Sequence, residues 1–184
     1  MVNEIQTYIH EYDFPYHDYL KSYKEDLINH YFYLKKENKN ITDFDLPLFH
    51  PITTFLIPKL NKIIKKNYWT DKPIANLGLR AYVQNNKENS SFYHNHKTPG
   101  SISGIFYLDP PQEGGEISFL INPDQDIPHL KEIIFKPKKN KLYLFPYWMY
   151  HKPLPQKDED YRICFNWVHG SPTRPIHKFT KSQW

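Results

Sequence analysis

A run of short strand-like segments, separated by turn residues, fills the C-terminal two thirds of the sequence and most constrains its fold. In the first segment, Leu79, Ala81 and Val83 alternate with polar or aromatic residues, which is the period of a half-buried strand. The predicted strands are residues 76–84, 92–96, 102–108, 116–121, 132–135, 142–145 and 162–168. Because turn chemistry rather than a helical pattern separates them, they favour an antiparallel sandwich or barrel.

Two helices are predicted ahead of these strands. Apolar residues recur at three- and four-residue spacing over residues 18–36, and a second helical pattern covers residues 52–66. Pro58 interrupts the second pattern, so that helix begins either near residue 52 or at the proline. We expect a single domain with an all-β core and a helical N-terminal region (α+β). Its helical part would cover residues 1–72 and its β part residues 73–170, followed by a tail over residues 171–184.

Composition narrows the class of protein. The chain has 184 residues, enough for one sizeable core, and its net charge of +4 comes from scattered lysines rather than a clustered nucleic-acid footprint. Its single cysteine, Cys164, excludes an internal disulfide and suits a reducing compartment. The sequence opens with no signal-peptide pattern, and no apolar run approaches the roughly 20 residues that cross a bilayer. We expect a soluble, cytoplasmic protein that binds neither membrane nor nucleic acid.

His94 and His96 are the first candidate metal ligands. Residues i and i+2 of a strand point to the same face, so the two imidazoles would converge on one point. Imidazole suits iron, zinc, copper and nickel, and the pair alone does not choose among them. A His-x-His pattern by itself is also common for surface or core histidines, so the prediction depends on the motifs farther along the chain.

Several motifs come after this pair in a fixed order. The strand over residues 102–108 ends at a proline turn, Gly114-Gly115-Glu116 opens the next strand, and residues 141–146 precede His151 and, eleven residues later, Arg162. This order resembles that of the iron(II)- and 2-oxoglutarate-dependent oxygenases, above all those of bacteria and phages whose first motif also reads His-x-His. The resemblance extends from about Leu77 to His169 and implies a double-stranded β-helix, or jelly-roll, with packing helices.

Arg162 is the candidate anchor for the co-substrate. Only three of the 24 cationic residues are arginines, and a guanidinium can bind a carboxylate through two parallel hydrogen bonds. In a strand, Arg162, Cys164 and Asn166 share one face, which would line a cavity. The resemblance implies that Arg162 binds the distal carboxylate of 2-oxoglutarate. It also implies a small hydroxyl residue at the position of Cys164, which is a weak donor, so we expect a tyrosine such as Tyr107 to assist instead. The alternative is a surface ion pair of Arg162 with an acid among residues 158–160.

The ligand set departs from the pattern of the family. Most relatives bind iron through two histidines and one carboxylate, and here His96 stands at the carboxylate position. We favour a site in which His94, His96 and His151 all bind Fe(II). In a second reading, His96 lies outside the ligand set and water or an anion fills the position. In a third, Asp109 or Glu116 supplies a carboxylate.

The resemblance implies an Fe(II)- and 2-oxoglutarate-dependent dioxygenase that hydroxylates a C–H bond and releases succinate and CO2. An amino-acid, peptide or other small-molecule substrate is expected, and the oligomeric state is left open. Two alternatives stay open, a cupin-like metal-binding protein and a binding module without oxygenase activity. The cupin reading is weaker because residues 97–101 lack the expected glutamate. The remaining histidines are expected to be solvated: His10, His17, His30, His50, His129, His169 and His177.

Overall fold

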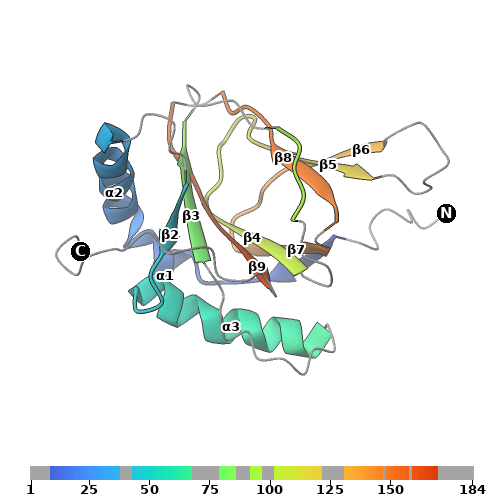
Figure 1. Ribbon diagram of the computed structural model, residues 1–184, viewed down its shortest axis with the longest axis horizontal. Coiled ribbons are helices and arrows are strands. Elements are labelled where there is room, and N and C mark those ends of the chain that lie inside the picture. Colours follow the sequence, from blue (N-terminus) through green and yellow to red (C-terminus); the bar gives the residue numbers. More distant parts are fainter. Residues whose placement is uncertain are drawn as a thin grey trace.

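A computed structural model describes residues 9–37, 43–67, 79–85, 92–96, 102–121, 131–146, 148–157 and 159–169. Two antiparallel sheets face each other, and helices cover the outer side of the larger sheet (Figure 1). Turn residues close the connections. Asn140, Gly114 and Gly115 all have positive φ angles, a conformation that asparagine and glycine adopt at low cost. The predicted all-β core with packing helices is thus observed.

The larger sheet has the strand order β1-β7-β4-β9-β3-β2, and the smaller sheet has the order β6-β5-β8. The strands of the larger sheet are β1 (His10–Asp13), β2 (Asp43–Leu46), β3 (Leu79–Gln84), β4 (Ile102–Asp109), β7 (Lys141–Pro146) and β9 (Arg162–His169). Those of the smaller sheet are β5 (Ile117–Ile121), β6 (Lys131–Phe135) and β8 (Tyr150–Pro153). Non-sequential neighbours such as β4 and β9 bring distant parts of the chain side by side.

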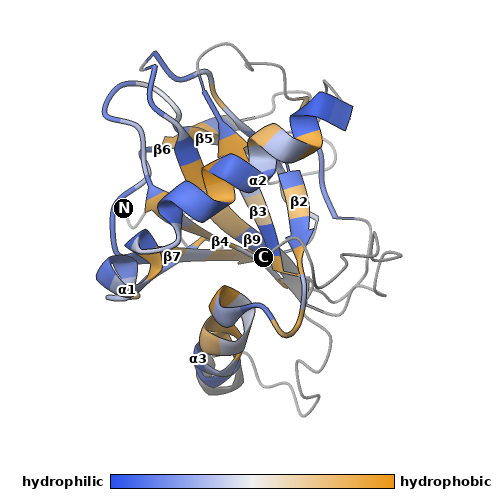
Figure 2. Ribbon diagram, turned by 90° about the vertical axis from the view of Figure 1, so that its left-hand side faces the viewer, coloured by the Kyte–Doolittle hydropathy of each residue, from blue (hydrophilic) through white to orange (hydrophobic). Residues whose placement is uncertain are grey.

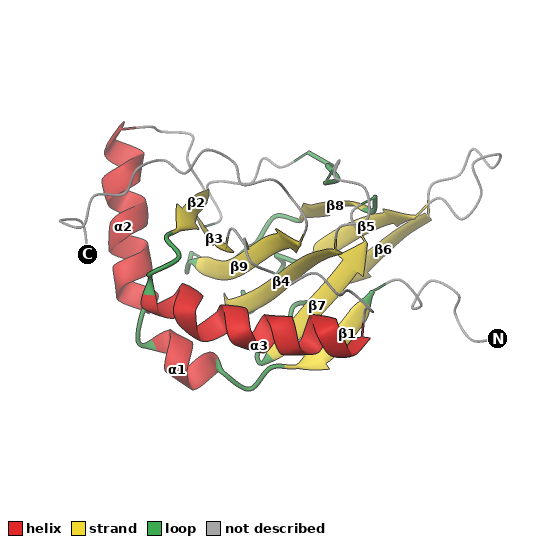
Figure 3. Cartoon of the chain, turned by 60° about the horizontal axis from the view of Figure 1, so that its bottom comes forward, coloured by secondary structure: helices red, strands yellow, loops and turns green. Residues whose placement is uncertain are grey.

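Three helices among the described residues pack on the outer face of the larger sheet: α1 (His17–Lys21), α2 (Lys24–Glu37) and α3 (Pro51–Asn67) (Figure 3). Polar and hydrophobic residues alternate along α2, which lies across the sheet (Figure 2). Leu27 of α2 and Leu56 of α3 are buried in one core with Ile163 and Phe165 of β9. Burial of these apolar side chains stabilises the outer layer.

A second core fills the space between the two sheets. Its buried members include Tyr107 from β4, Phe119 from β5, Phe145 from β7 and Cys164 from β9. The alternation of side chains along β9 explains why there are two cores. Cys164 points into the inner core, whereas its neighbour Ile163 belongs to the core that faces the helices. The inner core is the part of the fold that positions the candidate site.

The helical region differs from the prediction in two details. The helix predicted over residues 18–36 is broken into α1 and α2, and the Ser22 hydroxyl at the break donates a hydrogen bond to the carbonyl of Tyr19. The helix containing Pro58 begins at Pro51, a favourable first position for proline. It continues through Pro58 because core residues such as Leu56 and Leu60 lie on both sides of the proline.

Three short strands were missed by the sequence patterns. β1, β2 and β8 have four residues each, too few for a clear alternation, and the first two lie in the region predicted to be helical. In contrast, residues 92–96 form a single bridge at His94 instead of the predicted strand. Part of the first predicted strand, residues 76–78, lies outside the described residues.

The prediction of solvated histidines is wrong for His17, His30 and His50, which are 5%, 6% and 4% exposed. Each lies in or next to a helix that packs on the larger sheet, so its imidazole is buried with the helix. His129 and His177 lie outside the described residues. Among the parts of the chain that the structure describes, no helix combines the length and apolar character needed to span a bilayer.

Candidate functional site

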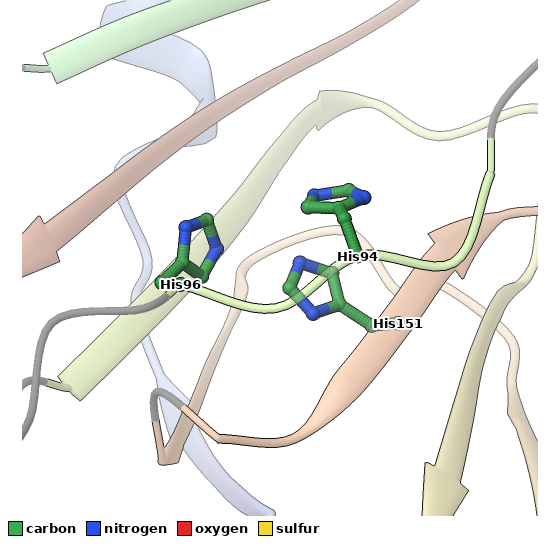
Figure 4. A group of neighbouring side chains, drawn as sticks. All are labelled: His94, His96 and His151. Atoms are coloured by element: carbon green, nitrogen blue, oxygen red, sulfur yellow. The ribbon is translucent and has the colours of Figure 1, made fainter.

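Three imidazoles converge at one edge of the smaller sheet. His94 and His96 lie on the segment that follows β3, and His151 lies on β8 (Figure 4). The ring centroids are 4.4 Å apart for His94 and His151, 5.1 Å apart for His96 and His151, and 5.7 Å apart for His94 and His96. One nitrogen from each ring lies within 4.8 Å of the others. The structure therefore brings the three predicted ligands together.

Backbone pairing explains why residues so far apart in the chain meet. The amide of His94 donates to the carbonyl of His151 at 3.1 Å, and the amide of His151 donates back at 2.9 Å. This reciprocal pair fixes the two α-carbons opposite each other and sets both imidazoles on one side of the bridge.

Local hydrogen bonds define which imidazole nitrogen is available. Nδ1 of His151 lies 3.0 Å from the carbonyl oxygen of Met149, and Nδ1 of His94 lies 3.2 Å from that of Phe92. A carbonyl oxygen only accepts, so each Nδ1 carries the proton and each Nε2 keeps its lone pair. Burial, opposed by the Met149 carbonyl, lowers the pKa of His151 to about 3, so this ring is neutral at pH 7.

The site has one apolar wall and one open side. The His151 ring centroid lies 4.8 Å from that of Phe145 and 6.0 Å from that of Phe119, both of which are buried in the inner core. His94 is exposed, and His96 is half-buried. A ligand could therefore approach from the side of His94 while the aromatic wall excludes water behind His151.

Arg162 is buried in the same inner region, with 5% of its surface exposed. Its Nη2 donates to Oε1 of Gln84, and its Nη1 donates to the carbonyls of Leu154 at 3.2 Å and Gly115 at 3.3 Å. These partners are neutral. The alternative ion pair is not seen with Glu159 or Asp160, and Asp158 lies outside the described residues. Within the described part of the chain, three of the five guanidinium N–H groups are used, and Nε–H and one Nη2–H are left to bind a carboxylate.

Tyr107 and Cys164 lie beside Arg162 on the inner face. They are directly opposite each other in the β4–β9 pair, and both are at most 5% exposed. Burial raises the pKa of the Tyr107 phenol, and it raises the pKa of the Cys164 thiol to about 11, while Arg162 opposes both shifts. Both groups are therefore neutral hydrogen-bonding groups at physiological pH.

Asn166 lies farther along β9, opposite Ile105 of β4 and Arg80 of β3. Its side chain is hydrogen-bonded to Tyr82, whose pKa burial raises to about 12. Asn166 thus shares the inner face with Arg162, as predicted, but is already engaged with another side chain.

The carboxylates considered as metal ligands do not join the histidines. Asp109 forms an ion pair with Lys24 of α2. Within the described part of the chain, the one group of side chains suited to a metal consists of the three histidines, without Glu116. A three-histidine donor set is therefore the arrangement that the geometry presents.

Gln84 is the site residue that the sequence did not identify. It is 5% exposed and lies directly opposite Arg162 in the β3–β9 pair. The alternation of β3 places Gln84 on the polar side of the strand, but only the pairing of β3 with β9 reveals its partner.

A sequence model of the family described as "Putative 2OG-Fe(II) oxygenase" matches residues 81–167. The match runs from β3 to β9 and includes the three histidines and Arg162. Residues 81–167 belong to the iron(II)- and 2-oxoglutarate-dependent oxygenases. The predicted resemblance is confirmed, and this oxygenase family implies Fe(II) as the metal, 2-oxoglutarate as co-substrate and a small-molecule or peptide substrate.

Solved structures agree with the oxygenase fold. A prolyl-4-hydroxylase from Pseudomonas putida has a TM-score of 0.61 and 10% identity over 93% of this chain and 97% of its own. AviO1 from Streptomyces viridochromogenes has a TM-score of 0.64 and 11% identity over 91% of both chains. A structure of prolyl 4-hydroxylases from Phytophthora capsici has a TM-score of 0.54 and 18% identity, over 85% of this chain and 59% of its own. The predicted double-stranded β-helix is confirmed. No curated protein sequence matches this chain.

Proposed function

We propose that this oxygenase is an Fe(II)- and 2-oxoglutarate-dependent dioxygenase that hydroxylates a C–H bond of an amino-acid, peptide or small-molecule substrate. The observation that carries the proposal is the convergence of three imidazole nitrogens within 4.8 Å of one another, next to an inner core that also holds a buried guanidinium. With iron and 2-oxoglutarate bound, O2 would be the oxidant: one oxygen atom would enter the succinate that leaves with CO2, and the other would become the hydroxyl group of the product.

His94, His96 and His151 would hold the metal. Imidazole is a suitable ligand for Fe(II), and the free Nε2 atoms of His94 and His151 have the lone pairs that coordination needs. Nitrogens that bind one metal at about 2.1 Å must lie closer together than 4.8 Å, so small rotations of the rings would close the cluster. Because the three ligands are neutral, the metal would keep its full double positive charge and attract an anionic co-substrate.

Arg162 would bind the distal carboxylate of 2-oxoglutarate through its two remaining N–H groups. Gln84, Gly115 and Leu154 would hold the guanidinium in orientation. Tyr107 and Cys164 would donate further hydrogen bonds, since both stay protonated. Asn166 remains a predicted contact, with its hydrogen bond to Tyr82 as a competing role. The aromatic wall behind His151 would keep water away from the reacting groups.

The substrate class is proposed by analogy of fold. Two of the similar structures are prolyl hydroxylases, which favours an amino-acid residue, free or in a peptide, over other small molecules. A screen of amino acids and short peptides for faster succinate release would test this class directly.

The metal assignment is tested by anaerobic titration with Fe(II) and 2-oxoglutarate. A visible charge-transfer band should appear in the wild-type protein and be lost in His151→Ala. His10→Ala, a change at an exposed histidine of β1, is the matched control and should keep the band. Absence of the band in the wild type, or its persistence in His151→Ala, would contradict the proposal.

A binding module without oxygenase chemistry is the second candidate, and it is favoured because no carboxylate of the described residues joins the histidine cluster. Uncoupled turnover separates the two functions. An enzyme should convert 2-oxoglutarate slowly to succinate without its primary substrate, and His151→Ala should abolish that conversion. A binding module should produce no succinate with Fe(II) and oxygen present.

A further inference from the structure

A hydrogen-bonded group on the outer face of the smaller sheet lies directly behind the histidine cluster. The Tyr93 hydroxyl is 2.6 Å from Oγ of Ser118 and 2.8 Å from Oε1 of Glu132, and Ser118 is 2.6 Å from the same oxygen. Lys152 completes the group, with its Nζ 4.3 Å from the centroid of the Tyr93 ring. The side chain of Tyr93 thus links the segment over residues 92–96 to β5, β6 and β8.

This group belongs to the opposite face from the candidate metal ligands. Ser118 and Lys152 are register partners on β5 and β8, whereas their chain neighbours Phe119 and His151 are also paired and touch each other inside the fold. Alternation along both strands therefore separates the two faces. Tyr93 contacts the outer pair, while the ring of His94 contacts His151.

The backbone of the segment over residues 92–96 pairs with a neighbouring strand at one position only, among the residues that the structure describes. It forms one bridge rather than a ladder, through the two backbone hydrogen bonds between His94 and His151. The His94 ring is exposed, and its Nδ1 bonds within its own segment, to the carbonyl of Phe92. The position of the imidazole therefore depends on how firmly the backbone around residue 93 is held.

We infer that Tyr93 is a positioning residue, which clamps the His94 segment onto β5 and β6 through Ser118 and Glu132 so that His94 is preorganised to bind the metal. The inference rests on the proposed function, because it concerns the same metal site. Loss of an outer partner that is hydrogen-bonded to a ligand side chain weakens metal affinity by about 10- to 100-fold. Tyr93 acts one step farther out, through the backbone, so we expect an effect at the lower end of this range.

The group persists at neutral pH. The hydrogen bonds from Ser118 and then Tyr93 lower the pKa of the Glu132 carboxyl, which is therefore ionised and accepts from both hydroxyls. An ionised acceptor makes these hydrogen bonds stronger than neutral ones. Replacement by glutamine would keep an acceptor oxygen, whereas replacement by alanine would remove it.

Titration of the metal-free protein with Co(II), which reports binding by its absorption spectrum, tests the inference. Tyr93→Phe, which removes one oxygen atom, should raise the Co(II) dissociation constant by about 10-fold. Tyr150→Phe is the matched control, because Tyr150 is an exposed tyrosine of β8 beside His151, and it should leave the constant unchanged. Glu132→Ala should weaken binding as Tyr93→Phe does, and Glu132→Gln should restore most of the affinity.

A second readout separates positioning from general destabilisation. In the Co(II) protein, the Nδ1–H protons of bound histidines give strongly shifted NMR signals. The signal of His94 should broaden or vanish in Tyr93→Phe while that of His151 persists. A loss of stability alone would weaken both equally and would not be reversed by the conservative change at Glu132.

The possible outcomes are distinct. Wild-type protein that binds no Co(II) would overturn the proposed metal site itself. If the wild type binds and Tyr93→Phe binds equally well, or if Tyr93→Phe and Tyr150→Phe weaken binding to the same extent, the positioning role is wrong and the metal site stands.

Discussion

Gln84 accepts a hydrogen bond from Nη2 of Arg162 through its side-chain oxygen, across the β3–β9 pair. Both residues are 5% exposed, so the bond lies away from competing water. The partner is neutral, so the guanidinium is oriented while its positive charge stays available. A carboxylate at the same position would orient the group equally well and cancel that charge.

The first prediction concerns this pair. Gln84→Leu leaves a buried donor unsatisfied and frees the guanidinium to turn, so 2-oxoglutarate should bind about 10-fold more weakly. Gln84→Glu should weaken binding more, by about 100-fold, because the new carboxylate competes with that of the ligand. Isothermal titration of the metal-loaded protein measures both constants. Gln112→Leu, at an exposed glutamine, is the control, and equal affinities in all four proteins would contradict the role of Gln84.

The second prediction concerns Gly115, whose carbonyl accepts from Arg162. Gly115 has φ +66°, and a β-carbon there would lie 2.2 Å from Cγ of Pro111. Gly115→Ala should therefore lower the free energy of unfolding by about 2–4 kcal/mol and also weaken 2-oxoglutarate binding. Urea unfolding measures the first effect. Adding Pro111→Ala should recover the part due to the clash, and a Gly115→Ala protein of unchanged stability would refute the argument.

The third prediction tests the alternative carboxylate ligand. Asp109 pairs with Lys24, and both side chains are about one-third exposed, so Asp109→Asn should reduce the free energy of unfolding by at most about 1 kcal/mol. Because Asp109 lies outside the histidine cluster, the Co(II) dissociation constant should stay within about twofold of the wild-type value. If Asp109 were a ligand, its loss would weaken binding by at least about 10-fold, as loss of even an outer partner does.

The sequence predicted those parts of the fold that have a clear period. The alternation of Leu79, Ala81 and Val83 identified β3, and all three side chains are fully buried in the core facing the helices. Four-residue strands such as β1 and β8 carry too few residues for such a pattern, and their pairing partners lie far away in the chain. The interruption of the helix predicted at Pro58 is also absent from α3, because burial of the flanking residues outweighs the helical hydrogen bond that proline cannot make.

The candidate site was predictable in its residue types but not in its supports. His94, His96, His151 and Arg162 were identified from spacing and resemblance, and the structure brings the histidines together. A strand was the predicted cause of the convergence of His94 and His96, yet their segment forms only one bridge. Partners such as Gln84 depend on which strands pair, information that no local pattern carries.

His50 makes a pH-dependent hydrogen bond at the start of α3 and does not belong to the histidine cluster. It lies one residue before α3, and its Nδ1 accepts a hydrogen bond from the amide of Ile52 at 3.2 Å, as a helix-capping group does. Burial, with a contribution from His30 and against that of Asp26, lowers the pKa of His50 to about 4. Protonation would remove the accepting lone pair and place a positive charge at the helix N-terminus.

The fourth prediction rests on this depressed pKa. The imidazole is neutral in the folded protein down to about pH 4, whereas in the unfolded chain it takes up a proton near pH 6.5. The stabilisation is therefore complete above pH 6.5 and is lost as the pH falls toward 4. Between pH 7.5 and 4.5, this one group should lower the free energy of unfolding by about 2–3 kcal/mol. Urea unfolding of the metal-free protein at both pH values measures the change. His50→Asn keeps a capping oxygen but does not titrate, so its stability should depend less on pH by the same amount. An equal pH dependence in the two proteins would show that His50 does not resist protonation in the folded state.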